Sequence, residues 1–444
     1  MISVLFGLIG STAIAAATTP SFADSTGTKT VSYLGHRFTV PAGWAVVDLT
    51  AAPQTCVRFD RHVVYLGTPD QYQNCPAHVV GISEALLMAP APATGAPPQT
   101  AEDPGEHELI VTGSGFTVTA TYRADRPLIQ RILASAGLPQ TGTTMAPARP
   151  PTAASAAALA GSAATNYTGK GFEACDTPSL STMSAWGSSP YRGVGMYFGG
   201  VNRSCKAQPN LTSTWVSRQA AAGWHFLPIY VGLQVANDSC SGCALIGSPT
   251  SDGTSAADDA ANRAAALGFG PGTVLYFDME SYALTASHSS VALAFEAAWT
   301  RELHARGFNS GYYSSGSTGI TDLVNHYSTN TMPDVIDVAN YNGKATTTDP
   351  YVPSGMWANH ERLHQYQGDH NETWGGVTIN IDLDYYDVQL GGAPADDAAM
   401  SAVANPATSN MEVYFNSGGA LTENFWNASR GWSGPFAIGG TITP

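Results

Sequence analysis

The sequence predicts an α/β protein built around a (β/α)8 TIM-like barrel, with a small α+β domain before it and a β-rich, partial propeller-type repeat after it. Between residues 168 and 391, apolar strand-like runs alternate with helical stretches, which is typical of βα units on a parallel sheet. Eight such runs fit in this range, the number that a (β/α)8 barrel needs. Segments rich in Pro, Ala, Thr and Ser at 138–167 and 392–409 have too few large apolar residues for a core and indicate linkers. A doubly wound open sheet is the alternative arrangement.

Residues 1–23 indicate a secretory signal peptide. The run from Ile2 to Ala17 is apolar or small, and Ser21-Phe22-Ala23 offers a small-x-small cleavage site, although no basic residue precedes the run. The run is short for a membrane-spanning helix and contains Gly, Ser and Thr, so a retained anchor is the weaker alternative. We therefore expect a secreted protein, either extracellular or associated with the cell wall.

The composition argues against several kinds of partner. Of the 444 residues, 43% are hydrophobic, which is enough for sizeable cores in two or three domains. Only 12% are charged, and the formal net charge is −15. Such an acidic chain is unsuited to nucleic acid held through phosphates and to electrostatic binding at a membrane surface. We expect no nucleic-acid partner and no stable membrane insertion, while the oligomeric state stays open.

Residues 30–137 are predicted to form the small α+β domain. Short runs with strand character begin at Phe38, His62 and Gly115, and a helical run covers 127–134. No cluster of catalytic residue types is evident in this region.

The six cysteines fit an oxidising compartment. They allow fifteen pairings, of which we favour one pair in the first segment and two in the central one: Cys56–Cys75, Cys175–Cys205 and Cys240–Cys243.

A zinc site is the alternative for two of the cysteines. Cys240-x-x-Cys243 would need two further ligands, and no second CxxC or HxxxH pair follows. His360 and His364 are four residues apart, but His364 lies in a predicted strand. We therefore predict no metal and no cofactor.

Apolar runs and glycines divide the barrel region into predicted strands and helices. In chain order, the eight candidate strands are 171–176, 193–198, 224–231, 273–280, 311–313, 335–341, 362–367 and 378–384. Helical stretches at 256–267 and 291–306 fall between strands, and a glycine that can cap the helix follows each of them.

The fourth candidate strand ends in two carboxylates, Asp278 and Glu280. Residues at i and i+2 of a strand point the same way, so both acids share a face with Val274 and Tyr276, while the residues between them face the other side. Catalytic groups of such barrels lie at the carboxyl ends of strands. Most glycosidases cleave the glycosidic bond with two carboxylates in a pocket.

Other predicted strand ends are polar too. Polar residues also occur there because strand ends reach solvent, but their repetition favours a site, since barrel closure brings the first and last strands together. The candidate binding residues are Asp176, Tyr276, Tyr341, Gln365, Asp382 and Asp384, with Trp374 as a loop residue that could stack on a sugar ring.

Residues 168–391 resemble the glycoside-hydrolase-like domain of secreted actinobacterial proteins, which is related to the barrel of glycoside hydrolase family 25, the peptidoglycan-cleaving muramidases. The matching motifs begin at Gly171, Gly195, Phe226, Tyr276, Gly311, His364 and Ile381. The resemblance implies that Glu280 is the general acid and that Asp278 orients a 2-acetamido group or stabilises positive charge. It also implies that Asp176 and Asp382 line an acidic pocket. Whether Asp382 or Asp384 points inward stays open.

Residues 410–444 resemble one blade of a β-propeller lectin. Aromatic strand-like runs begin at Met411 and Phe425, and a Gly-Trp-Ser-Gly turn follows at Gly431. A single blade cannot bury both of its faces, so we expect an incomplete repeat.

Together these features predict a secreted, glycoside hydrolase-like protein that acts on N-acetylated amino-sugar glycans such as peptidoglycan, with Glu280 as acid and Asp278 assisting. One alternative is a non-catalytic protein that binds cell-wall glycan in the acidic groove. A purely structural secreted protein is the other.

Overall fold

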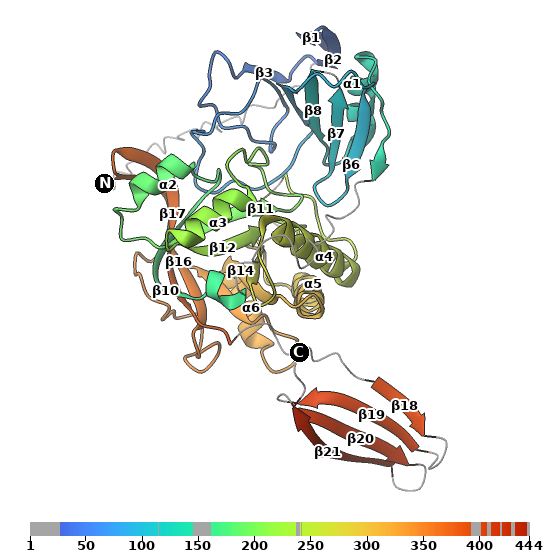
Figure 1. Cartoon of the computed structure of the whole chain (residues 1–444), viewed down its shortest axis with the longest axis vertical. Coiled ribbons are helices and arrows are strands. Elements are labelled where there is room, and N and C mark those ends of the chain that lie inside the picture. The colour runs from blue at the N-terminus through green and yellow to red at the C-terminus, as the bar shows by residue number, and fades with distance from the viewer. Residues whose placement is uncertain are drawn as a thin grey trace, which may run out of the picture.

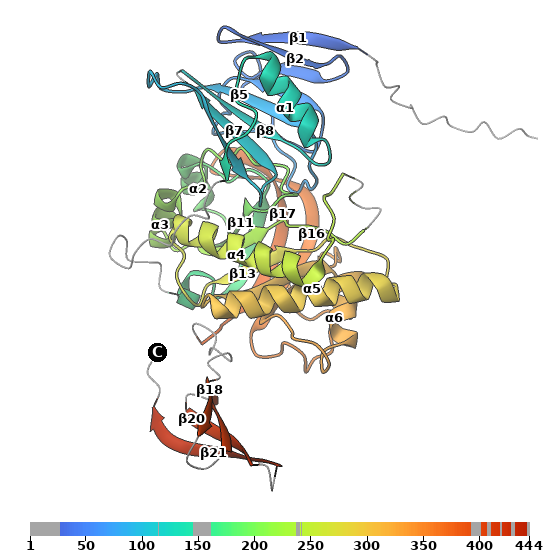
Figure 2. The same cartoon turned by 90° about the vertical axis from the view of Figure 1, so that its right-hand side faces the viewer.

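The structure is a computed structural model of the chain (Figures 1 and 2). It describes residues 27–113, 115–144, 161–236, 240 and 242–391, together with the backbone of four later strands. The predicted signal segment, 1–23, lies outside the described residues, as do 145–160 of the first predicted linker and 392–400 and 406–409 of the second.

Eight strands of the central region close into a barrel in chain order. They are β10 (Tyr167–Ala174), β11 (Gly193–Gly199), β12 (His225–Tyr230), β13 (Val274–Asp278), β14 (Asn309–Ser315), β15 (Val335–Ala339), β16 (Glu361–Trp374) and β17 (Val377–Val388). Neighbours from β10 to β16 are parallel, but β17 is antiparallel to both β16 and β10, so the barrel is mixed.

The predicted (β/α)8 TIM-like barrel is therefore wrong. Helices follow the first five strands: α2 (Leu180–Trp186), α3 (Ser213–Ala221), α4 (Pro249–Leu267), α5 (Ala286–Ala305) and α6 (Thr321–Asn325). Residues 340–360 form turns instead of a helix, and only Gly375-Gly376 separates β16 from β17. An apolar pattern locates a strand without giving its direction, and a two-residue connection can only join antiparallel neighbours.

The two faces of the barrel sheet bury different side chains. Leu275, Phe277 and Met279 point outward into the layer shared with the helices, where Phe277 lies against Phe295 and Trp299 of α5. The inward side chains fill the lower half of the barrel with an apolar plug of Leu227, Ile229, Val274, Tyr276, Val335, Leu363, Tyr386 and Val388. Polar side chains inside the barrel are therefore confined to the end near the carboxyl termini of the parallel strands.

The described residues of the N-terminal region form a hairpin, a sheet and one helix. The hairpin is β1 (Thr28–Tyr33) with β2 (His36–Pro41), and the helix is α1 (Arg126–Ser135). In spatial order the sheet is β3 (Ala45–Asp48), β4 (Val63–Leu66), β5 (Ala85–Pro90), β8 (Phe116–Thr121), β7 (Glu108–Gly113), β6 (Gln99–Asp103) and β9 (Thr143–Thr144).

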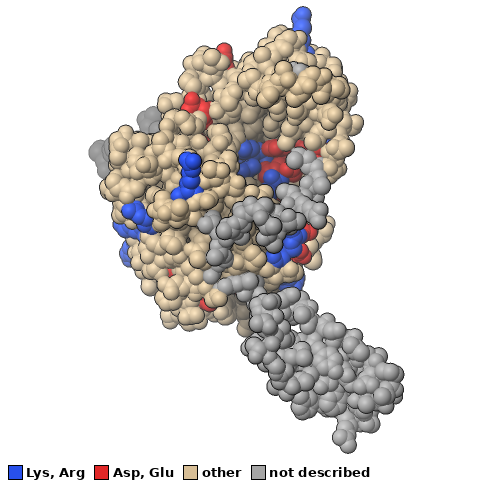
Figure 3. All heavy atoms as spheres, viewed as in Figure 1, with Lys and Arg blue, Asp and Glu red and all other residues tan. Residues whose placement is uncertain are grey.

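This region lies directly against the barrel (Figure 2). Basic and acidic side chains gather where the two meet (Figure 3). Glu106, which is buried, forms ion pairs with Lys206, Arg203 and Arg263, and Arg263 also reaches Asp103. Because a buried charge is tolerated only when it is paired, this network fixes how the two regions meet.

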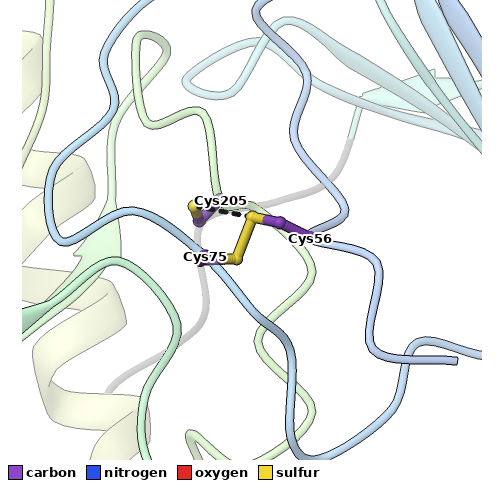
Figure 4. Close-up of side chains that lie close together, drawn as sticks. All are labelled: Cys56, Cys75 and Cys205. Carbon is purple, nitrogen blue, oxygen red and sulfur yellow. Dashed lines mark hydrogen bonds between the residues drawn. A yellow bond between two sulfur atoms is a disulfide. The ribbon is translucent and has the colours of Figure 1, made fainter. Parts of the chain in front are cut away.

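The structure contains the three disulfides that the sequence predicted, Cys56–Cys75, Cys175–Cys205 and Cys240–Cys243. Two of them touch across the junction, because Cys56 Sγ lies 3.9 Å from Cys205 Sγ (Figure 4). The first disulfide therefore holds a loop of the N-terminal region against the barrel.

The last four strands form an antiparallel sheet in chain order: β18 (Ser401–Asn405), β19 (Asn410–Ser417), β20 (Ala420–Asn427) and β21 (Gly431–Thr441). β18 falls within the range predicted as the second linker. Within the part of the chain that the structure describes, no helix has both the length and the apolar character needed to cross a bilayer.

Candidate active site

Carboxyl side chains gather at the open end of the barrel, above the apolar plug. They are Glu173 from β10, Asp278 from β13, Glu280 just after it, Asp337 from β15, and Asp382 and Asp384 from β17. All are buried except Glu280, whose side chain is 16% exposed. We call this group the acidic mouth; Glu280 is the member that reaches the surface.

The backbone around Asp278 and Glu280 is fixed by one amide side chain. Gln234 Nε2 donates to the carbonyl of Asp278 at 2.7 Å, and Gln234 Oε1 accepts from the backbone N–H of Glu280 at 2.8 Å. This bridge satisfies two polar groups where β13 ends, and it holds the two carboxyls in a defined relation.

A histidine of the N-terminal region enters the acidic mouth. His78, in the loop between β4 and β5, places Nε2 2.8 Å from Glu280 Oε1 and 4.0 Å from Asp278 Oδ2. Its Nδ1 lies 2.7 Å from the Tyr197 hydroxyl, which donates to Glu173 Oε2 at 2.7 Å. Glu280, His78, Tyr197 and Glu173 thus form a continuous hydrogen-bonded chain.

These contacts give the two strand-end carboxyls opposite proton affinities. Burial opposes a charge on His78, but the hydrogen bond to Glu280 and the surrounding carboxylates outweigh it and raise the pKa of His78 to about 10. Burial alone would raise the pKa of Glu280, yet the hydrogen bond and charge of His78 lower it. Burial, together with the charge of Glu280, raises the pKa of Asp278 well above its usual range. These contacts therefore favour a protonated Asp278 and an ionised Glu280.

A deeper group of three carboxyls lies beneath this pair. One oxygen each of Glu173, Asp337 and Asp384 lies within 4.8 Å of the others. Burial, followed by the charge of neighbouring carboxylates, raises the pKa of Glu173 and of Asp337 to about 8 and that of Asp384 well above its usual range. Protons can therefore neutralise these acids, so the arrangement does not require a metal ion.

An open cavity of about 340 Å³ lies beside Glu280. Tyr313 and Tyr341 line it, and the hydroxyl of each donates to Gln365 Oε1 at 2.9 Å. Tyr341 is 61% exposed, and Tyr351 and Asn340 also line the cavity. Glu280 is the one member of the acidic mouth among the residues that line this cavity, so a sugar bound there would meet Glu280 first.

The structure brings together most, but not all, of the residues singled out from the sequence. Asp382 and Asp384 both point inward, because they are two residues apart on β17; Asp382 accepts from the backbone N–H of Asp369 at 2.7 Å. Tyr276 lies in the apolar plug beneath the carboxyls.

Asp176 and Trp374 lie outside the acidic mouth. Asp176 accepts from Gln73 Nε2 at 3.2 Å and lines a separate cavity of about 300 Å³. Trp374 lies at the tip of the β16–β17 hairpin, where its Nε1 donates to Glu372. Neither residue lines the cavity beside Glu280.

Sequence reasoning missed Glu173, Asp337 and His78. Glu173 was within reach of the strand argument, because it shares a face with Gly171 in the first strand, three residues before the favoured Asp176. Asp337 sits inside a predicted strand as its single acid. His78 gave no signal at all, since it lies in an irregular loop 202 residues before Glu280.

One known protein family matches the part of the chain that carries Asp278 and Glu280. Residues 184–386 match the family model of the Rv2525c-like, glycoside hydrolase-like domain. The barrel is therefore similar to a glycoside hydrolase-like domain. The matched part of this domain includes Asp278, Glu280, Asp337, Asp382 and Asp384, whereas Glu173 and His78 precede it.

Two solved structures show distant similarity to part of this chain. An uncharacterized protein from B. stearothermophilus is 18% identical, with a TM-score of 0.34, over 49% of this chain and 95% of its own. The catalytic domain of endolysin ply40 from bacteriophage P40 of Listeria monocytogenes is 17% identical, with a TM-score of 0.30, over 46% of this chain and 85% of its own. At this level of similarity neither structure informs the reaction. No curated protein matches the chain.

Proposed function

We propose that this protein is a glycan-acting hydrolase and that the acidic mouth is its active site. The observation that carries the proposal is the pair of carboxyls, Asp278 and Glu280, at the open end of the barrel, with Glu280 lining an open cavity. Glycosidases work with a pair of carboxyl groups, one of which donates a proton to the leaving oxygen. The glycoside hydrolase-like domain supports the same class of reaction.

The proposed substrates are glycans of N-acetylated amino sugars such as peptidoglycan. In this proposal Glu280, which faces the cavity, protonates the leaving oxygen. Asp278, buried directly behind it, orients the 2-acetamido group or, in its ionised form, stabilises the positive charge that develops on the sugar. Use of the acetamido group in this way removes the need for a carboxylate nucleophile. We propose export from the cell as the setting, in keeping with the N-terminal sequence and the disulfides.

Replacement of Glu280 tests the proposal. Glu280→Gln keeps the size and hydrogen-bonding capacity of the side chain but removes the transferable proton, so the release of reducing ends from peptidoglycan should fall by about 10²-fold or more. Glu361→Gln is the matched control, because Glu361 begins β16 at the opposite end of the barrel. Equal release by the wild-type protein and Glu280→Gln would refute the assignment.

A non-catalytic glycan-binding protein is the second candidate. The ion pair between His78 and Glu280 favours it, because an ionised Glu280 cannot protonate a leaving group. In that case the wild-type protein should be retained on purified peptidoglycan and should release no reducing ends at any pH at which it is folded.

A further inference from the structure

We propose that His78 is a positioning residue that controls the active site: through its pairing with Glu280 it holds this carboxylate in the ionised form, and so it sets the pH below which Glu280 can act as the proton donor. This inference rests on the proposed function, because it concerns the regulation of the same site. It assigns to the N-terminal region a role that its own sequence does not indicate.

The loop that carries His78 is built against the acidic mouth. The backbone N–H of Ala77 donates to Asn380 Oδ1 at 2.6 Å, and that of Gly81 donates to the carbonyl of Asn202 at 2.8 Å. Three residues before His78, Cys75 is joined to Cys56, whose sulfur touches Cys205 of the barrel (Figure 4). Contacts on both sides of His78 therefore place it in the mouth, so its position does not depend on the ion pair alone.

The groups facing His78 come from several barrel strands. Asp278 and Glu280 approach from the end of β13, Tyr197 from β11, and the ring of Tyr313 from β14 at 6.4 Å between centroids. The negative charge of Asp382 favours the charged form of His78, and the charge of His78 in turn favours ionisation of Glu173. Because the surrounding ionisable groups are acids and tyrosines, the mouth favours the charged imidazolium.

The pairing determines where one proton resides. With His78 in place, the imidazole holds the proton and Glu280 is an ionised acceptor. As the pH falls below the pKa of Glu280, this carboxylate takes up a proton from water while His78 keeps its own. Only the second state has a proton at the carboxyl that lines the cavity, as the proposed reaction requires.

The ion pair can be tested without any measurement of activity. In wild-type protein labelled with ¹³C-histidine, NMR titration should show one imidazole that stays charged far above neutral pH, with a pKa of about 10. This resonance should be absent in His78→Gln and should titrate at a lower pH in Glu280→Gln. A His78 that titrates near the ordinary histidine value of 6.5 in the wild-type protein would overturn the inference, whatever the activity.

The control of activity is tested by pH profiles of peptidoglycan hydrolysis. A general acid works below its pKa, so loss of His78, which raises the pKa of Glu280, should move the high-pH limit of activity upward. Above that limit the rate of His78→Gln should exceed the wild-type rate about tenfold for each unit by which the pKa rises. His62→Gln is the matched control, because His62 faces Glu84 within the N-terminal region, at 3.8 Å, and should keep the wild-type profile.

The outcomes separate the two proposals. If the wild-type protein cleaves glycan and folded His78→Gln shows an unchanged or lower profile, His78 does not restrain Glu280, and the inference falls while the proposed function stands. If neither protein cleaves any glycan, the proposed function falls and the control role falls with it. If His78→Gln does not fold, the NMR titration of the wild-type protein still decides whether the pair exists.

Discussion

Asp278 and Glu280 show how environment separates two identical functional groups. They lie two residues apart, yet Asp278 is enclosed by the barrel and keeps its proton, while Glu280 lies beside a cavity and against His78 and loses it. The sequence alone places both on one face of a strand, but it does not show this difference, because the residue that causes it lies far away in the chain.

Asp337 gives a residue-scale prediction about stability. Burial raises its pKa from 3.8 to about 8, so the folded state binds a proton that the unfolded state has already released between these values. The free energy of unfolding should therefore fall as pH rises through this window. Asp337→Asn has no such proton, so its stability relative to wild type should increase by up to about 1.4 kcal/mol for each pH unit.

Chemical denaturation at several pH values from 4 to 9 measures this difference. A stability difference between Asp337→Asn and wild type that does not change with pH would show that Asp337 titrates normally in the folded protein.

At the scale of elements, the barrel departs from a regular alternation of strands and helices at its last two strands. The sequence signal for this departure is present in Gly375-Gly376, which stands directly between two strand-like runs. Both glycines have positive φ, 56° and 82°, as tight two-residue hairpins require. Counting strands without weighing this turn gave the wrong barrel class, although the strand positions and the faces of β13 followed from apolar periodicity.

The turn gives an element-scale prediction. No atom lies within 4 Å of the position that a Cβ at Gly376 would take, so Gly376→Ala should cost only the strain of a left-handed backbone, about 1–2 kcal/mol in the free energy of unfolding. Gly355→Ala is the control, because that site is also open and its φ is not in the left-handed region. Equal stability of the two variants would contradict the hairpin geometry.

Alternation along a strand also explains why Glu173, and not the predicted Asp176, belongs to the acidic mouth. The inward positions of β10 are Gly171 and Glu173, and the next acid in the sequence, Asp176, lies beyond the end of the strand. A prediction based on strand ends selects the last acid, Asp176. The alternation of side chains along the strand instead places Glu173 on the inward face. The disulfides could be foreseen because each pair lies within one segment of the chain.

At the scale of the whole molecule, the site belongs to two regions of the chain. The barrel provides the carboxyls and the cavity, and the N-terminal region provides His78 and is held in place by the ion network around Glu106 and by neighbouring disulfides. Such an arrangement depends on how two separate regions meet, which periodicity and motif spacing within one segment do not reveal.

The most direct test of the central claim is a crystal structure of Glu280→Gln with an N-acetylated amino-sugar oligosaccharide. We predict that the sugar occupies the cavity lined by Tyr313 and Tyr341, with a glycosidic oxygen within about 2.6–3.2 Å of the residue 280 side chain. An oligosaccharide bound elsewhere, for example in the larger cavity of about 620 Å³ lined by Arg263 and Asp259, would contradict the assignment of the acidic mouth as the active site.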